Sequence, residues 1–196
     1  MIKRGFDILF SILGLVILSP IFIILAIAII LDSKGGVFYL QSRVGKNNHD
    51  FNLIKFRSMK INADKDGLLT VGDNDSRITN IGAFIRKYKL DELPQLFNVL
   101  MDDMSLVGPR PEVRKYVDLY TKEQLMVLKV KPGITDYASL EYFKENEILA
   151  KSNNFEKTYI EEVMPHKLEL NKKYIENPSL IHDIKLIFKT LLRIIK

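Results

Sequence analysis

One long apolar run dominates the hydrophobic pattern of this chain. Residues 8–31 are 24 consecutive positions without a charge, and 20 of them are apolar. At about 1.5 Å per residue, a helix over this run measures roughly 36 Å, which is enough to cross a bilayer. No other run reaches the roughly 18 apolar residues that a membrane span requires, so the pattern excludes a polytopic transporter.

The middle of this run contains Ser19-Pro20. Proline removes a backbone donor and clashes with the preceding turn, so it kinks or breaks a helix, and a serine hydroxyl can bond to a carbonyl that the break frees. Basic residues, which prefer the cytoplasmic side, flank the run at Lys3, Arg4 and Lys34. The pattern therefore fits a kinked spanning helix or a re-entrant helix. The run is too long for the apolar core of a cleaved signal peptide.

Shorter patterns after the run predict a mixed domain. Alternating apolar residues and nearby turn signals predict strands at 38–43, 51–56 and 68–71. Beyond Arg77 the apolar spacing becomes helical. Helices are expected at 81–88, 92–101, 111–130, 142–150 and 155–176, with Pro165 bending the last of these. The expected fold class is α+β, mostly helical with a minor β-sheet.

The last segment, residues 180–196, predicts an amphipathic helix. Its apolar residues Ile184, Phe188 and Leu191 share one side, and basic residues such as Lys185 and Lys189 recur every four positions on another. This pattern is typical of a helix in the membrane interface, and equally of one whose apolar side packs on the domain core.

Composition narrows the possible chemistry. The chain has 196 residues and a mass of 22.7 kDa, the size of one domain with an appendage. It has no cysteine, which excludes a disulfide scaffold, a thiol nucleophile and Cys-ligated zinc. The net charge of +5 favours an anionic partner. Because acids interrupt the basic residues and no recognition motif is present, we expect phosphate-rich small molecules at a membrane surface, and no nucleic acid.

Asp91-Glu92 is the most suggestive carboxylate pair. It follows a basic stretch, residues 86–89, and is expected to open the helix at 92–101. A carboxylate at a helix N-terminus is stabilised in its ionised form, and an ionised aspartate can attack phosphorus to form an aspartyl-phosphate. The pair could also bind Mg²⁺. An ordinary helix cap explains the same residues without any catalytic role.

Three other segments could bind phosphate or metal. Pro109-Arg110-Pro111 is a stiff loop whose guanidinium could grip a diphosphate, although a rigid connector has the same sequence. Lys55 and Arg57 place cations on a strand edge, which equally suits a solvated face. Asp73-Asn74-Asp75 is a D-x-D triplet, which metal-dependent glycosyltransferases use and polar turns also contain.

Taken together, these segments resemble the bacterial sugar transferase family of small monotopic phosphoglycosyl transferases. The resemblance runs from Lys3 to about Ala138. The matching strings, in chain order, are Lys3-Arg4 to Asp7, Ser19-Pro20, Gln41-Ser42-Arg43-Val44-Gly45, Lys55-Phe56-Arg57-Ser58-Met59, Asp75-Ser76-Arg77-Ile78-Thr79 with Gly82 and Arg86, Asp91 to Leu100, Asp103-Met104-Ser105 with Val107 to Pro111, and Lys131-Pro132-Gly133-Ile134-Thr135.

The resemblance implies a reaction and a location. A phosphosugar would move from a UDP-sugar to a polyprenol (undecaprenyl) phosphate, with Mg²⁺ as cofactor and release of UMP, as the first membrane step of surface glycan assembly. It also implies a re-entrant membrane helix over 1–33, broken at Ser19-Pro20. Residues 34–196 would then form a catalytic domain on the cytoplasmic face of the bacterial inner membrane.

The resemblance also assigns roles to residues. Asp91 resembles the nucleophile and Glu92 its acidic partner, and both would contact the metal. The stretch Pro109-Arg110-Pro111 resembles the one that recognises the nucleotide. The cations expected to contact phosphate are Lys55, Arg57, Arg77 and Arg86.

Two departures from the family pattern are visible. Asp102 stands where glycine is usual, and residues 136–140 differ from the best-known small members, which leaves the sugar unidentified. Two other functions stay open: a metal-dependent glycosyltransferase using Asp73 and Asp75, and a non-catalytic membrane adaptor. Release of UMP would indicate a phosphoglycosyl transferase, release of UDP would indicate the glycosyltransferase, and an adaptor would turn over no UDP-sugar.

Overall fold

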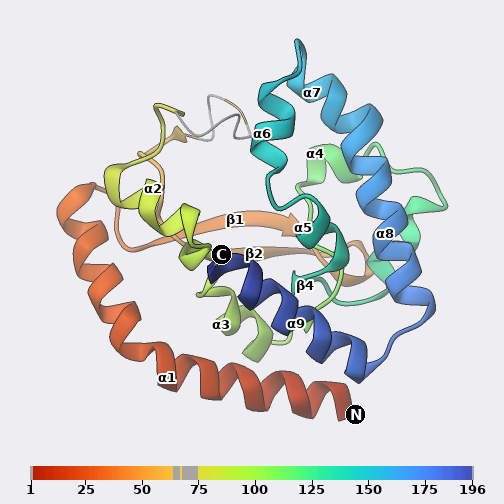
Figure 1. Cartoon of the computed structure of the whole chain (residues 1–196), viewed down its shortest axis with the longest axis horizontal. Coiled ribbons are helices and arrows are strands. Elements are labelled where there is room, and N and C mark those ends of the chain that lie inside the picture. The colour runs from red at the N-terminus through yellow and green to blue at the C-terminus, as the bar shows by residue number, and fades with distance from the viewer. Residues whose placement is uncertain (1, 64–66, 68–74, 196) are drawn as a thin grey trace.

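The computed structural model describes residues 2–63, 67 and 75–195. Figure 1 shows a mostly helical molecule with short strands, which confirms the α+β class. The helices are α1 (Ile2–Asp32), α2 (Asn80–Lys87), α3 (Gln95–Leu100), α4 (Arg114–Val117), α5 (Tyr137–Glu141), α6 (Glu145–Ala150), α7 (Phe155–Thr158), α8 (Met164–Glu176) and α9 (Leu180–Ile195). The strands are β1 (Phe38–Val44), β2 (Asp50–Phe56), β3 (Ser105–Val107) and β4 (Gly133–Thr135). The expected strand at 68–71 and the position of Asp73 lie outside the described residues.

Helix α1 is the one described helix that is long and apolar enough to cross a membrane. It continues through Pro20 and bends near its middle, so that it curves around one edge of the molecule (Figure 1). Ser19 lies beside the proline, and its hydroxyl donates to the Val16 carbonyl at 2.8 Å. The Ser-Pro pair therefore kinks the helix without ending it.

Both ends of α1 are tied to the same globular body. Near its start, Arg4 donates to the carbonyl of Val99 at 2.7 Å, close to the end of α3. At its last residue, Asp32 accepts from the backbone N–H of Ile81 in α2 at 2.9 Å. Between these ends, Leu25 and Ile29 are buried against the body, while most other apolar side chains of the helix are exposed.

The strands form two small sheets, as the topology shows. Strands β1 and β2, both predicted from the sequence, pair as an antiparallel hairpin with Phe38 opposite Phe56, and Asn47 supplies a left-handed turn residue between them at φ 56°. Strands β3 and β4 pair in parallel, which the sequence did not predict. This second pairing requires two glycines, because a Cβ on Gly133 would lie 2.1 Å from the Gly108 nitrogen.

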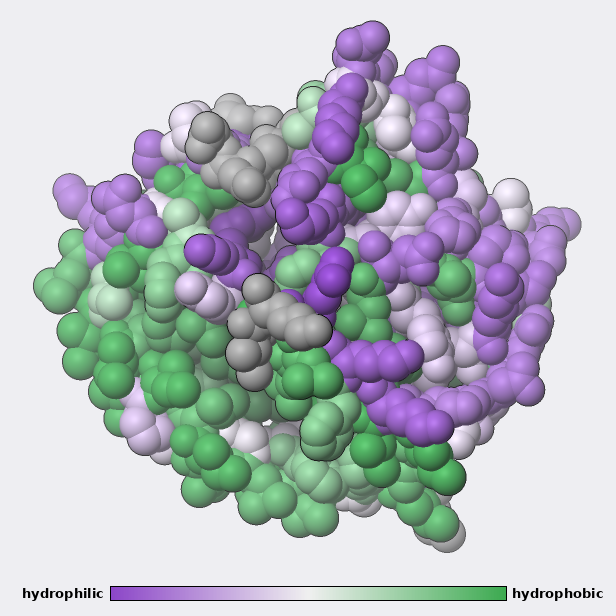
Figure 2. Space-filling model, in the orientation of Figure 1, coloured by the Kyte–Doolittle hydropathy of each residue, from purple (hydrophilic) through white to green (hydrophobic). Residues whose placement is uncertain are grey.

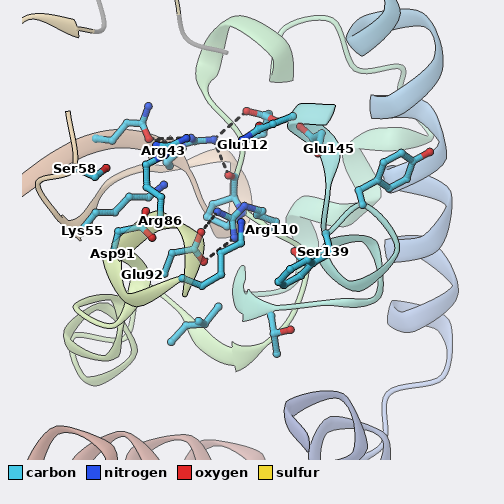
Figure 3. Close-up of a pocket in the computed structure, with 18 of the residues that line it drawn as sticks. Arg43, Lys55, Ser58, Arg86, Asp91, Glu92, Arg110, Glu112, Ser139 and Glu145 are labelled. Atoms are coloured by element: carbon cyan, nitrogen blue, oxygen red, sulfur yellow. Dashed lines mark hydrogen bonds and ion pairs between the residues drawn. The ribbon is translucent and has the colours of Figure 1, made fainter. Parts of the chain in front are cut away.

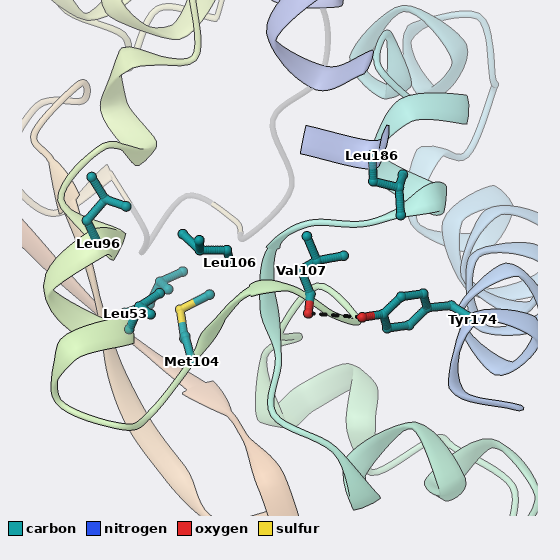
Figure 4. Packing of buried hydrophobic residues seen from close by; sticks show 8 residues of the cluster. Leu53, Leu96, Met104, Leu106, Val107, Tyr174 and Leu186 are labelled. Carbon is teal, nitrogen blue, oxygen red and sulfur yellow. Dashed lines mark hydrogen bonds between the residues drawn. The ribbon is translucent and has the colours of Figure 1, made fainter. Parts of the chain in front are cut away.

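The main core lies where α3, β2, β3, α8 and α9 meet (Figure 4). Its buried residues are Leu53, Leu96, Val99, Met104, Leu106, Val107, Tyr174 and Leu186. The hydroxyl of Tyr174 lies 3.3 Å from the carbonyl of Val107 and donates to Asp183 at 2.7 Å. This core fixes β3, and β3 leads directly into the loop that carries Arg110.

The predicted helix at 111–130 is wrong. The structure has only α4 and, after a turn, a 3₁₀ segment at Gln124–Lys129. Thr121 and Gln124 explain the interruption, because each side chain bonds to the other residue's backbone N–H, at 2.8 and 3.2 Å. This reciprocal cap starts a new turn and competes with a continuous helix.

The remaining predictions hold with changes in the boundaries. The expected helix at 142–150 corresponds to α6 alone, and α5, directly before it, is a helix that the sequence did not predict. The expected helix at 155–176 corresponds to α7 and α8, joined by a π-helical turn at Tyr159–Val163. Pro165 follows that turn at the start of α8. In α9 the predicted apolar side is exposed at Phe188, Leu191 and Leu192, whereas Asp183 and Leu186 face the core. Ile187, on the same predicted side, packs against the core, so the apolar side of α9 is packed in part and exposed for the rest.

Asp102, which departs from the family pattern, occupies a left-handed turn at φ 75°. That conformation favours glycine, but an aspartate tolerates it better than most residues. Its carboxylate pairs with Arg4 of α1 at 2.8 Å and also with Lys131. The departure therefore keeps the turn and adds ion pairs, and these lower the pKa of Asp102.

Candidate active site

Asp91 and Glu92 lie on a 3₁₀ turn, Leu90–Glu92, that precedes α3. The turn begins after Lys89, whose left-handed backbone at φ 54° redirects the chain from the end of α2. Helix α3 starts only at Gln95. Asp91 therefore lies one turn before the helix that it was expected to open. Its carboxylate does not cap α3.

Asp91 is a buried carboxylate with an unpartnered oxygen. Its side chain is 7% exposed, and Oδ1 has no hydrogen-bond partner among the described residues. Burial and the neighbouring charge of Glu92 raise the pKa of Asp91, while Lys55, Arg86 and Lys89 oppose that rise. An unsatisfied buried carboxylate costs free energy, so the fold retains Asp91 at the expense of stability.

Glu92 and Arg110 form a two-pronged ion pair. The guanidinium nitrogens of Arg110 donate to the two carboxylate oxygens of Glu92 at 2.5 and 3.0 Å. The charge of Arg110 overcomes the effect of burial and holds the pKa of Glu92 well below its usual range, and Glu92 raises the pKa of Arg110 in return. Both groups therefore stay charged at neutral pH.

The backbone of Arg110 is held by a residue that the sequence analysis did not assign to the site. Oδ2 of Asp136 accepts from the Arg110 N–H at 3.1 Å, while Oδ1 caps α5 by accepting from the N–H of Ser139 at 2.6 Å. Asp136 is 1% exposed. An aspartate directly before a short helix was the available signal, since such residues commonly cap helices.

Asp91, Glu92 and Arg110 line one cavity of about 630 Å³. Figure 3 shows Lys55, Arg86 and Asp91 on one side of Arg110, with Ser139 and Glu145 on the other. Burial and the charges of Arg110 and Arg43 lower the pKa of Lys55 to about 7. A buried carboxylate pair surrounded by cations suits a reaction at a phosphate group.

Comparison with known proteins identifies the family. Residues 1–196 match the sequence profile of the family described as "Bacterial sugar transferase". The chain belongs to this family. The resemblance inferred from the motifs is confirmed.

Relatives within the bacterial sugar transferase family differ in length. The "UDP-N-acetylgalactosamine-undecaprenyl-phosphate N-acetylgalactosaminephosphotransferase" of Aeromonas hydrophila is 41% identical over 193 residues, which cover 97% of this chain and 43% of the relative. The "UDP-glucose:undecaprenyl-phosphate glucose-1-phosphate transferase" of Escherichia coli (strain K12) is 35% identical over 98% of this chain and 40% of the relative. The "Exopolysaccharide production protein ExoY" of Rhizobium meliloti is 31% identical over 97% and 84%. The chain thus spans less than half of the first two relatives and most of the third.

Most of the other residues predicted to bind phosphate line the same cavity. Lys55, Arg57, Arg77, Arg86 and Pro111 line the cavity, and Pro109 lines a small neighbouring pocket. Arg57 also donates to the carbonyls of Gly36 and Phe38, at 3.0 and 3.2 Å, and so ties the start of β1 to the end of β2.

Arg77 and Asp75 form a second two-pronged ion pair. Arg77 Nε donates to Oδ1 of Asp75 at 2.9 Å, Nη2 donates to Oδ2 at 2.6 Å, and Arg77 lowers the pKa of Asp75. The carboxylate of Asp75 is therefore engaged by an arginine. Asp73, its partner in the D-x-D triplet, lies outside the described residues.

The carboxylate pair fits a magnesium ion. Within the described part of the chain, no group of three or more His, Cys, Asp or Glu side chains could enclose a metal. Mg²⁺ does not need one, because it commonly binds one or two carboxylates together with waters and substrate phosphates. The unpartnered Oδ1 of Asp91 and the adjacent Glu92 supply such ligands at the cavity wall.

Proposed function

We propose that this protein transfers a sugar 1-phosphate from a UDP-sugar to polyprenol (undecaprenyl) phosphate and releases UMP. The printed names of the Aeromonas and E. coli relatives describe transfer of this kind to undecaprenyl phosphate. The observation that carries the proposal is Asp91, which lines a cavity rich in cations and has a buried carboxylate oxygen, Oδ1, without a partner among the described residues. Such a group is poised to react at a bound phosphate.

The proposed reaction has two displacements. In the first, a carboxylate oxygen of Asp91 attacks the phosphorus that bears the sugar. A P–O–C bond to Asp91 forms, and the diphosphate bond breaks so that UMP leaves with the bonding electron pair. In the second, a phosphate oxygen of the polyprenol phosphate attacks the same phosphorus and frees Asp91. The product is a polyprenol diphosphosugar.

Charges around the cavity support both displacements. Attack of one anion on another is repulsive, and cations placed beforehand lower this cost without rearranging during the reaction. Arg110, Lys55 and Arg86 lie on the cavity wall for this role. Mg²⁺ bound to Asp91 and Glu92 would supply Lewis-acid neutralisation of phosphate oxygens. Arg110 remains oriented because Glu92 grips its guanidinium and Asp136 holds its backbone.

Helices α1 and α9 support the proposed membrane placement. Exposed apolar side chains gather over the edge where α1 runs, whereas hydrophilic residues cover the region of α6 to α8 (Figure 2). Since both ends of α1 contact one body, the helix would enter and leave the bilayer on the same face. We place residues 1–33 in the membrane as a re-entrant helix. Residues 34–196 then lie on the cytoplasmic face of the bacterial inner membrane, with α9 in the interface.

The reaction is tested by omitting the acceptor. Protein incubated with Mg²⁺ and a series of UDP-sugars, without polyprenol phosphate, should release about one UMP per active site with the correct sugar. The intact mass should rise by one phosphosugar, on the peptide that contains Asp91. If turnover needs both substrates together and no adduct survives any quench, Asp91 is not the nucleophile and transfer is direct. Release of UDP would indicate a glycosyltransferase.

The re-entrant placement is tested by labelling. The chain has no cysteine, so Ile2→Cys and Lys34→Cys each introduce one thiol on either side of the apolar run. In intact inner-membrane vesicles, a membrane-impermeant reagent should label both thiols from the cytoplasmic face. Labelling of the two positions from opposite faces would show that α1 spans the membrane.

A further inference from the structure

Beyond Arg110, the cavity has lining residues that the proposed displacements do not use. We call this part of the cavity the helical lobe, because its lining residues come from α5, α6 and α8 and the turns between them. Polar and aromatic side chains line it, including Ser139, Tyr142, Glu145 and Lys167. One of these residues, Ser139, belongs to the stretch 136–140, which differs from the best-known small members of the family.

An ion pair forms part of the wall of the helical lobe. Lys167 of α8 donates to Oε2 of Glu145, the first residue of α6, at 2.7 Å. The two side chains are only 14% and 23% exposed. Oε1 of Glu145 has no hydrogen-bond partner in the part of the chain that the structure describes. The Glu145 carboxylate therefore offers a charged acceptor to the lobe and Lys167 offers a donor. Their ion pair holds both side chains in place.

Ser139 adds an unpartnered hydroxyl. Ser139 lines the cavity, and its buried Oγ makes no hydrogen bond to any described residue. Its backbone N–H is already satisfied by Asp136. Leaving a buried hydroxyl unpaired costs roughly 1–3 kcal/mol, so the position is unfavourable for folding alone. A bound polar group would complete it.

The order of charges along the cavity indicates what the helical lobe binds. Asp91 adjoins Glu92, Glu92 grips Arg110, and the carboxylate of Glu145 lies close enough to help raise the pKa of Arg110 (Figure 3). If the diphosphate of a UDP-sugar is held at Arg110, one of the uncharged groups attached to it, the ribose or the sugar, would therefore lie toward Glu145. A carboxylate repels phosphate but accepts strongly from hydroxyl groups. Aromatic rings beside it, Tyr142 and Phe143, suit the flat face of a ring.

We propose that Glu145, Lys167 and Ser139 bind the ring hydroxyl groups of the sugar nucleotide. This inference rests on the proposed function, because it assumes a UDP-sugar whose diphosphate lies at Arg110. Neighbouring ring hydroxyls occur both in the ribose and in the transferred sugar. Glu145 would accept from two such hydroxyls, Lys167 would donate to a ring oxygen, and Ser139 would complete the set.

Glu145→Gln tests the charged acceptor with little change of shape. The amide oxygen can still accept from Lys167, so the contact between α6 and α8 is kept. Affinity for UDP-sugar, measured by calorimetry, should fall roughly 10- to 100-fold, the usual effect of losing a hydrogen bond to a charged group. Glu147→Gln is the matched control, since Glu147 lies on the same helix and its partner is the exposed Lys144. This control should bind UDP-sugar as the wild type does.

Comparing the affinity for UMP with the affinity for UDP-sugars shows whether Glu145 binds the ribose or the transferred sugar. If affinity for UMP falls together with that for UDP-sugar, Glu145 binds the ribose. If UMP binds normally and the preference among UDP-sugars changes, Glu145 binds the transferred sugar. Unchanged affinity for UMP and for every UDP-sugar would overturn the proposal. A wild type that binds UDP-sugar without releasing UMP would instead contradict the proposed function, and the binding comparison would still decide the role of Glu145.

Ser139→Ala separates a binding role from a structural one. The change removes an unsatisfied buried hydroxyl, so the melting temperature should stay the same or rise. UDP-sugar affinity should fall several-fold, and UMP affinity should change only if Glu145→Gln also changes it. A lower melting temperature with unchanged affinity would assign Ser139 to the fold and remove it from the site.

Discussion

Two buried aspartates in this protein have opposite surroundings. Asp7 of α1 is 3% exposed, and its two oxygens accept from the Ser105 hydroxyl at 2.8 Å and the Leu106 N–H at 3.2 Å. Asp91 is 7% exposed, and its Oδ1 has no partner among the described residues. Asp7 therefore joins α1 to β3, whereas Oδ1 of Asp91 has no such partner.

The difference teaches where stability and reactivity reside. A carboxylate whose oxygens are paired gains from burial of its hydrogen bonds, while an unpaired one costs free energy until a ligand completes it. The two sites are also connected along the chain, because β3 leads from Ser105 through Gly108 to Arg110. Helix α1 thus helps to position the loop that carries Arg110.

The largest expected effect is loss of turnover in Asp91→Asn. A neutral amide cannot displace UMP, so UMP release should fall by at least roughly 10³-fold, as when other nucleophiles are removed. The melting temperature should be unchanged or higher, because the variant no longer buries an unpaired charge. A variant that loses both activity and fold would show that Asp91, like Asp7, holds the structure together.

Arg110→Lys should have the next largest effect on activity. Lysine keeps the charge but loses the fork that holds both oxygens of Glu92, so turnover should fall roughly 10- to 100-fold. Steady-state UMP release and UDP-sugar affinity measure the loss. Wild-type values for both would return the Pro109-Arg110-Pro111 loop to a purely structural role.

Asp7→Ala should act mainly on stability. It leaves the Ser105 hydroxyl and the Leu106 N–H buried without their acceptor, at a cost of roughly 1–3 kcal/mol each. The melting temperature in detergent or nanodiscs should therefore fall clearly. Well below that temperature, the variant should still form the covalent adduct. An adduct lost at every temperature would mean that Asp7 also takes part in the chemistry.

The place of Asp91, Glu92 and Arg110 in one cavity could be anticipated from the sequence because the evidence for each residue is local. Asp91, Glu92 and Arg110 each stand in a short string with a recognisable chemical character. The strands at 38–43 and 51–56 were also predictable from alternation and turn residues. The structure shows what these strings could not, namely that Arg110 grips Glu92 across 18 residues of sequence.

The missed features depend on contacts between distant segments. Strands β3 and β4 are three residues each and pair only because Gly108 and Gly133 allow close approach. Asp136 acts on Arg110 from 26 positions away. The helix expected at 111–130 was wrong for a local reason, since the Thr121–Gln124 cap outweighs a favourable apolar spacing. The spacing of apolar residues carries no information about contacts between distant segments or about side-chain caps, so it could predict neither.

The smallest expected effect comes from Ser11→Ala, and it tests whether an unpaired buried group is sufficient to mark a functional site. Ser11 is fully buried in α1, its Oγ has no partner among the described residues, and it is absent from the lining of the cavity. Alanine removes the unpaired hydroxyl and favours the helix, so stability should rise by about 0–1 kcal/mol. Adduct formation and turnover should match the wild type. If activity falls instead, a buried unpaired group that does not line the cavity can still affect function. The contrast between Asp7 and Asp91 would then depend only on the covalent chemistry measured at Asp91.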